Sequence, residues 1–90
     1  MPTKVRVTWA DVLDALRWLA ESDRPGGRPT KLEPINRRIA ILRASDLDLA
    51  GGYGGWAEIL PAGRAALALV EVIGSGGLDA EVVVPKEGAQ

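Results

Sequence analysis

The side chains of this chain that could do catalytic chemistry are two pairs of carboxylates. Asp11 and Asp14 share one face of a predicted helix, and Asp46 and Asp48 share one face of a predicted strand. Acid–base catalysis by such a pair needs a partner base or a bound metal, and histidine is the commonest source of both. The sequence contains no histidine and no cysteine. We therefore interpret both pairs as solvated surface carboxylates and predict no metal site.

Motifs for nucleophilic catalysis and for phosphate binding are missing as well. Ser22, Ser45 and Ser75 fall in predicted loops or helix ends, without a histidine or a nearby lysine to activate them. Neither glycine cluster forms a dinucleotide-binding fingerprint, and the GSGG segment lacks the following lysine of a phosphate-binding loop. We therefore expect a protein without enzymatic activity that needs no cofactor.

Charge is unevenly distributed along a chain whose formal net charge is only −1. Between residues 24 and 43 a single acid, Glu33, stands among six basic residues: Arg24, Arg28, Lys31, Arg37, Arg38 and Arg43. Residues 44–90 carry seven acids against two basic residues. A partner meets the local field rather than the total charge, and phosphate contacts need cations gathered on one surface. The basic segment is thus a candidate nucleic-acid surface, with a solvated basic helix as the alternative.

The elements that would position these side chains begin with a helix predicted over residues 8–21. Thr8 and Asp11 have the spacing of a capping box. Apolar residues then recur at helical spacing, namely Trp9, Val12, Leu13, Leu16, Leu19 and Ala20. Trp18 lies opposite this stripe, among acidic residues. We expect it to be covered by the C-terminal segment or by a partner chain, because tryptophan is enriched at interface hot spots.

A second helix is predicted after a loop over residues 22–29, which holds two prolines and two adjacent glycines. Thr30 and Glu33 repeat the capping-box spacing, and Pro34 suits a first helical turn. The helix would bury a stripe of Leu32, Ile35, Ile39 and Leu42, flanked by Arg38, and would point Arg37 and Ile41 away from it. It would end near residues 44–45.

Beyond this helix the sequence predicts a hairpin, a third helix and two short terminal strands. Leu47 and Leu49 alternate with aspartates, so residues 46–60 form a hairpin around a glycine-rich tip at 51–55. A helix over residues 61–73 would be capped by Gly74, with a strand over 67–73 as the alternative. Its apolar face would consist of Ala62, Ala66, Leu69, Val70 and Ile73. The terminal strands would include Val5 and Val7 at one end and residues 78–84 at the other.

Length and composition predict one α+β domain over residues 1–90, with residues 86–90 as a frayed tail. Apolar residues make up 47% and charged residues 26% of the chain, as in ordinary soluble globular proteins. No apolar run approaches the roughly 20 residues that span a bilayer, and residues 1–9 lack the apolar region of a secretory signal. We therefore expect a cytoplasmic protein without membrane contact.

The segment around the glycine-rich tip resembles part of a winged helix-turn-helix domain. In regulators of the MarR and PadR type, an aromatic residue is followed by a leucine-threonine pattern that ends in glycine-arginine. Trp56 and the run Leu60-Pro61-Ala62-Gly63-Arg64 stand in those places. The resemblance covers about residues 32–70. It implies a winged-helix-like fold with a recognition helix at 35–44, a wing at 51–55, and a C-terminal helix at 61–73 of the kind often used for dimerisation.

Two departures separate the chain from this family. A proline stands at position 61 in place of threonine, and residues 22–29 leave no room for the helix that normally precedes the recognition helix.

The function expected from these patterns is DNA binding without catalysis, as a transcription regulator and as a homodimer. Groove or phosphate contacts would come from Arg37, Arg38 and Arg43, backbone contacts from Arg24, Arg28 and Lys31, and wing contacts from Tyr53. The alternative is a protein-interaction or inhibitor module of the phage type that binds a nucleic-acid-processing partner. Its contacts would be its acidic surface together with Trp18, Tyr53 and Trp56. A structural subunit of a larger assembly is a third possibility.

Overall fold

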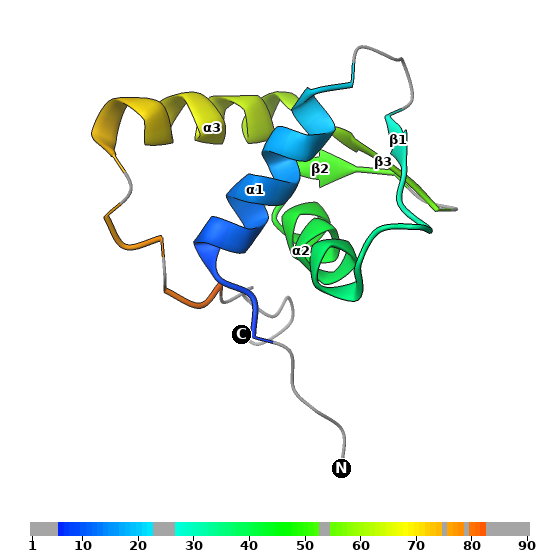
Figure 1. The fold of residues 1–90 in the computed structure, drawn as a ribbon. Helices are drawn as coiled ribbons and strands as arrows, with labels where there is room; N and C mark the ends of the chain where they lie inside the picture. The colour runs from blue at the N-terminus through cyan, green and yellow to red at the C-terminus, as the bar shows by residue number, and fades with distance from the viewer. Residues whose placement is uncertain (1–5, 23–26, 53–54, 75, 79, 83–90) are drawn as a thin grey trace, which may run out of the picture.

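Three helices pack around a small three-stranded sheet in the computed structural model of this protein, which describes residues 6–22, 27–52, 55–74, 76–78 and 80–82 (Figure 1). In chain order the elements are α1 (Trp9–Ala20), β1 (Arg28–Pro29), α2 (Ile35–Asp46), β2 (Ala50–Gly51), β3 (Trp56–Ile59) and α3 (Pro61–Ile73). The sheet is antiparallel with strand order β1-β3-β2. The prediction of a small α+β domain is confirmed at this level.

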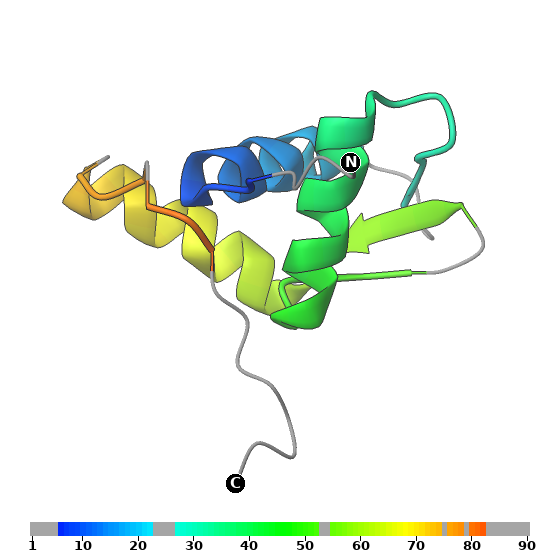
Figure 2. The same cartoon turned by 90° about the horizontal axis from the view of Figure 1, so that it is seen from below.

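The helix α1 forms the centre of the molecule and contacts both α2 and α3 (Figure 2). Its capping box is present as predicted, since the Thr8 hydroxyl accepts from the Asp11 amide and the Asp11 carboxylate accepts from the Thr8 amide. Four residues of the predicted apolar stripe are buried in the core, namely Val12, Leu13, Leu16 and Leu19, and Ala15 is buried beside them. Sequence periodicity therefore predicted this helix correctly.

The helix α2 buries a different face from the predicted one. Ala40, Ile41 and Ala44 face the core, and Ile41 is only 6% exposed. Three of the four residues of the predicted stripe lie outward instead: Leu42 is 61%, Ile35 is 58% and Leu32 is 97% exposed. The fourth, Ile39, packs partly buried against the core. Both sides of this helix carry aliphatic residues, so periodicity alone does not decide which side meets the core.

The start of α2 differs from the prediction too. Pro34 is the N-cap rather than the first helical residue, and no side chain caps this end. The Thr30 hydroxyl donates to the Gly55 carbonyl instead, and Glu33 accepts from the Arg37 guanidinium. The residues predicted as a capping box thus link the turn before α2 to the hairpin, through Thr30, and to α2 itself, through Glu33.

The strand β1 lies inside the segment that was predicted to be a loop. Arg28 pairs with Ala57, and Pro29 pairs with Trp56. The backbone of Gly27 just before β1 has φ +87°, and a Cβ there would lie 1.9 Å from the Ala57 carbonyl oxygen. The strand therefore needs glycine at this position.

The predicted hairpin is present but shorter than expected. The helix α2 runs to Asp46, and the chain then turns through Asp48, which has a positive φ of 61°, so residues 47–49 form no strand. Ala50 pairs with Ile59, and the Leu60 amide donates to the Leu49 carbonyl.

The segment at 61–73 is a helix, as predicted, and Gly74 forms its C-cap. Ala66, Leu67 and Val70 pack on the core, whereas Ala62 and Leu69 are exposed, contrary to the expected face. Gly63 allows the close approach to the hairpin, since a Cβ there would lie 2.2 Å from the Leu49 carbonyl oxygen. Among the described residues, no helix is long and apolar enough to cross a bilayer.

The two ends of the described chain meet beside α1. Thr8 and Glu81 form an isolated antiparallel bridge, and the Val82 amide donates to the Val7 carbonyl at 2.8 Å. Residues 76–78 form a turn rather than the start of the predicted strand. Val5 and the tail at 83–90 lie outside the described residues.

Candidate functional site

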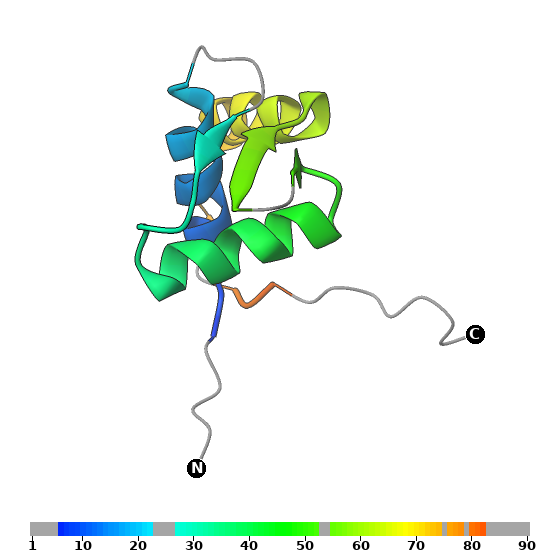
Figure 3. The same ribbon diagram turned by 90° about the vertical axis from the view of Figure 1, so that its right-hand side faces the viewer.

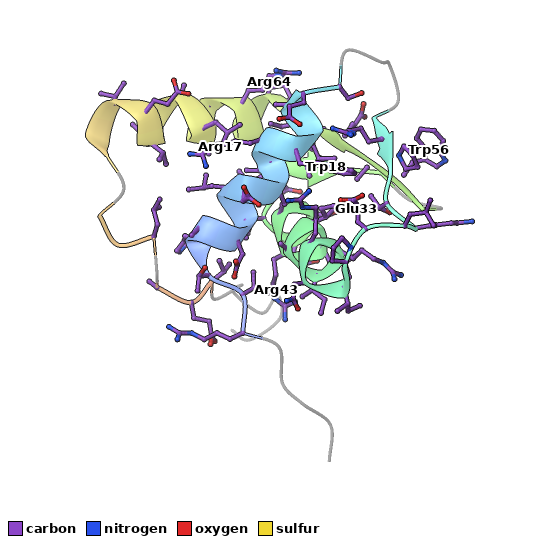
Figure 4. All side chains as sticks on the ribbon, viewed as in Figure 1. Arg17, Trp18, Glu33, Arg43, Trp56 and Arg64 are labelled. Carbon is purple, nitrogen blue, oxygen red and sulfur yellow. The ribbon has the colours of Figure 1, made fainter. Side chains whose placement is uncertain are left out.

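Trp18 is the centre of a cluster that includes Arg28 and Arg37, two of the arginines predicted to contact DNA. The Arg28 guanidinium lies 4.1 Å from the centre of the Trp18 ring, and that of Arg37 lies 5.5 Å away. Arg28 also donates to the Trp18 carbonyl at 2.8 Å. The indole on α1 is thus covered by arginines from β1 and α2, near Glu33 (Figure 4). The expectation of cover by the C-terminal segment or a partner chain is wrong for this face of the ring.

Acidic side chains neutralise the arginines of this Trp18 cluster. Arg37 bonds Asp14 at 3.0 Å and Glu33 at 3.2 Å, which links α2 to α1. Arg28 lies 3.6 Å from Glu21. Part of the basic segment is therefore used to hold the fold together, and its charge is partly compensated there.

The other basic residues predicted to contact DNA differ in whether an acidic side chain lies beside them. Arg43 lies 3.7 Å from Asp46, one turn further along α2. Arg38 and Lys31 are exposed and form no ion pair within the described part of the chain. Arg24 and Tyr53 lie outside the described residues.

A groove between α2 and the β2–β3 hairpin brings one of these residues, Arg38, together with Trp56. We call it the α2–hairpin groove; its volume is about 250 Å³, and it is lined by Thr30, Arg38, Ile41, Leu42, Ser45, Gly51, Gly52, Gly55, Trp56 and Ala57. Figure 3 shows α2 lying alongside the hairpin. The glycine-rich hairpin and Arg38 therefore share one face of the molecule.

Local structure explains how the groove is shaped. Gly52 has φ +127° and Gly55 has φ +89°, and a Cβ on Gly52 would lie 2.4 Å from the Trp56 carbonyl oxygen. The Lys31 side chain crosses Gly55 so closely that a Cβ there would lie 2.7 Å from the Lys31 Cε atom. The glycines thus let the chain turn tightly and let a basic side chain lie across the hairpin.

The rim of the groove is apolar. Trp56 is 47% exposed and projects from the outer end of the hairpin (Figure 4), and Leu42 faces solvent from α2. The sequence pattern singled out Trp56 but assigned Leu42 to the core. The sequence did contain a signal that Leu42 could be exposed. Ala40, Ile41 and Ala44 form a second aliphatic face of α2, and this face could be buried in place of the one that holds Leu42.

A second hollow, of about 390 Å³, lies between α1 and the start of α2. Its lining includes Asp11, Asp14, Glu33 and Arg37. These groups already serve the α1 cap and the Arg37 ion pairs. Across the residues with described positions, no group of three or more acids could hold a metal ion. The charged groups of this hollow are therefore engaged in the α1 cap and in contacts that hold α1 and α2 together.

Comparison with family models, with curated proteins and with solved structures finds no match to this chain.

Proposed function

We propose that this chain is a winged-helix-like protein that binds DNA without enzymatic activity, with α2 as recognition helix and the β2–β3 hairpin as wing. The observation that carries the proposal is the shared face: Arg38 and the glycine-rich hairpin border one groove, and Lys31 crosses Gly55 beside it. Two exposed cations there would meet phosphates. The glycines would let a nucleic-acid backbone come close.

The order of the elements supports this reading. The helix α2 follows β1 and leads into the hairpin, and α3 then packs against α1. One difference from the family pattern persists, because residues 27–34 contain β1 and a turn but no helix. The helix α1, which packs against α2, would take the place of that missing helix.

The residues expected to contact DNA differ from those predicted from the sequence, because α2 turns a different face to solvent. Arg38 and Lys31 would make the principal contacts, with Arg43 contributing beside its partner Asp46. Arg38 would bond a guanine edge or a phosphate. The exposed Leu42 would touch a thymine methyl, because Ile41 is buried and cannot reach one. The contribution of Arg24 and Tyr53 stays a prediction.

The proposal includes a homodimer acting as a transcription regulator in the cytoplasm. The lack of cysteine suits a reducing compartment, and a dimer would place two α2 helices on one duplex.

An electrophoretic shift with random duplex DNA at low salt tests the proposal. We expect a shift at micromolar protein, at least tenfold weaker binding on combined Lys31→Glu and Arg38→Glu substitution, and a fall of about 2 in the salt slope. Arg17→Glu is the matched control, because Arg17 is an exposed arginine on α1 that does not line the α2–hairpin groove (Figure 4). Absence of a shift, or a shift that the double reversal leaves unchanged, would exclude the proposal.

A further inference from the structure

The α2–hairpin groove has an apolar character that contact with phosphates does not require. Ile41 and Ala57 contribute buried aliphatic surface, and Leu42 and Trp56 stand exposed at its edges. Ile35 continues this surface, two helical turns before Leu42 on the same side of α2. Protein–DNA interfaces are more polar than protein–protein interfaces, whereas exposed aromatic and arginine side chains are enriched where proteins bind proteins.

The charge around the groove has one sign. None of the side chains that line it is acidic. Arg38 belongs to the lining and Lys31 crosses the nearby Gly55, and both lack an ion-pair partner among the residues that are described. Arg28, Arg37 and Arg43, by contrast, each lie beside a carboxylate. The groove thus combines apolar walls with cations whose charge no neighbour compensates.

The size of the groove limits what it can hold. Pockets for drug-sized ligands and cofactors usually have about 300–1,000 Å³, and this groove has about 250 Å³. Beyond Leu42 the exposed aliphatic surface continues along α2 to Ile35. These dimensions fit an apolar side chain whose own backbone continues along the helix.

From these observations we infer that the groove binds a segment of a partner protein in which a large apolar residue adjoins aspartate or glutamate. The apolar residue sits between Leu42 and Trp56, and the carboxylates meet Arg38 and Lys31. This site goes beyond DNA binding and does not depend on it. Because the same two cations would serve both, the acidic segment and a duplex would exclude one another.

Selection of peptides on the 90-residue chain tests the inference. The probe is a phage-displayed library of random dodecapeptides, and the selected peptides are then synthesised with a fluorescent label for anisotropy titration. We expect a consensus of leucine, phenylalanine or tryptophan next to aspartate or glutamate. Arg38→Glu and Leu42→Asp should each weaken binding at least tenfold. The matched controls Arg17→Glu and Ala62→Asp, at exposed positions of α1 and α3 outside the groove lining, should leave the affinity unchanged.

Each outcome supports or overturns the inference. Peptides without acidic residues, no enriched peptides, or peptides insensitive to both Arg38→Glu and Leu42→Asp overturn it. If Leu42→Asp fails to fold by circular dichroism, Trp56→Ala takes its place, because that side chain is half-exposed on the hairpin. Duplex binding that depends on Arg38, without acidic-peptide binding, overturns this inference and leaves the proposed function standing. Acidic-peptide binding without duplex binding supports this inference and excludes the proposed function.

Discussion

Trp18 and its two arginines illustrate how single residues acquire roles that their type does not reveal. A surface indole and a run of basic residues both suggest binding to an external partner. Here Arg28 and Arg37 lie over the indole, and carboxylates from α1 and from the turn before α2 lie beside them. The attraction between a guanidinium and an indole face, which grows as water is excluded, favours this internal use.

Removal of the Trp18 ring should therefore destabilise the fold. We expect Trp18→Ala to lower the free energy of unfolding by about 2 kcal/mol, because a half-buried aromatic ring and two cation–π contacts are lost. Urea denaturation followed by circular dichroism measures the change. The control is Trp56→Ala, which should stay within about 0.5 kcal/mol because that ring is half-exposed and projects from the hairpin. Equal losses for the two variants would contradict the role given to the Trp18 cluster.

The helix α2 shows how one element with two apolar sides divides them between core and surface. Ala40, Ile41 and Ala44 are small or branched residues that fit against α1. Ile35 and Leu42 stay in solvent beside the hairpin. Exposed apolar side chains mark a binding site only where they form a contiguous patch, so the relevant feature is that Ile35 and Leu42 share one side of α2.

Neighbouring positions of α2 test this assignment directly. Ile41→Ala should lower the free energy of unfolding by about 2–4 kcal/mol, since it opens a cavity in the core. Leu42→Ala, the adjacent substitution, should change it by less than about 0.5 kcal/mol. Thermal or urea unfolding of both variants provides the measurement. A larger loss for Leu42→Ala would show that the apolar stripe first expected from the sequence is the buried one.

The sequence predicted the helices and strands whose formation depends on residues close together in the chain. The helix α1 has a capping box and one apolar stripe, and the hairpin has its glycines, so both were expected in nearly the right place. The strand β1 has two residues, one of them a proline, and exists because β3 pairs with it. Long-range pairing of this kind leaves no periodic trace in a short segment, and the same holds for the contact between Thr30 and Gly55 that closes one end of the groove.

At the scale of the whole molecule, α2 and α3 present different surfaces. The outward side of α3 carries Ala65, Ala68, Leu69 and Val72, all exposed, with Arg64 and Glu71 along one edge. In an antiparallel pair of such helices, small residues would allow close approach, and Arg64 of one copy would face Glu71 of the other. This surface suits the homodimer that the proposed function includes, because a two-fold contact must be complementary to itself.

Val72→Glu tests the dimer without touching the α2–hairpin groove. Light scattering should give twice the chain mass for the unchanged protein and the mass of a single chain for the variant, because a buried carboxylate without a partner opposes association. Val72 is 82% exposed in the single chain, so the variant should keep its urea midpoint at low protein concentration. Leu42→Ser is the control on the opposite surface, and it should leave the mass unchanged. Single-chain mass for the unchanged protein would exclude the dimer.

The bridge between Thr8 and Glu81 also bears on the order of folding. It closes a loop that contains every helix and strand of the described chain, and it does so with few hydrogen bonds. Closure of so long a loop costs chain entropy that only an already folded centre reduces. The bridge should thus form after α1 has packed on its neighbours and open before they separate. The amide of Val82 would exchange with solvent long before those at the centre of α1, and it would report fraying of the ends while the α2–hairpin groove stays intact.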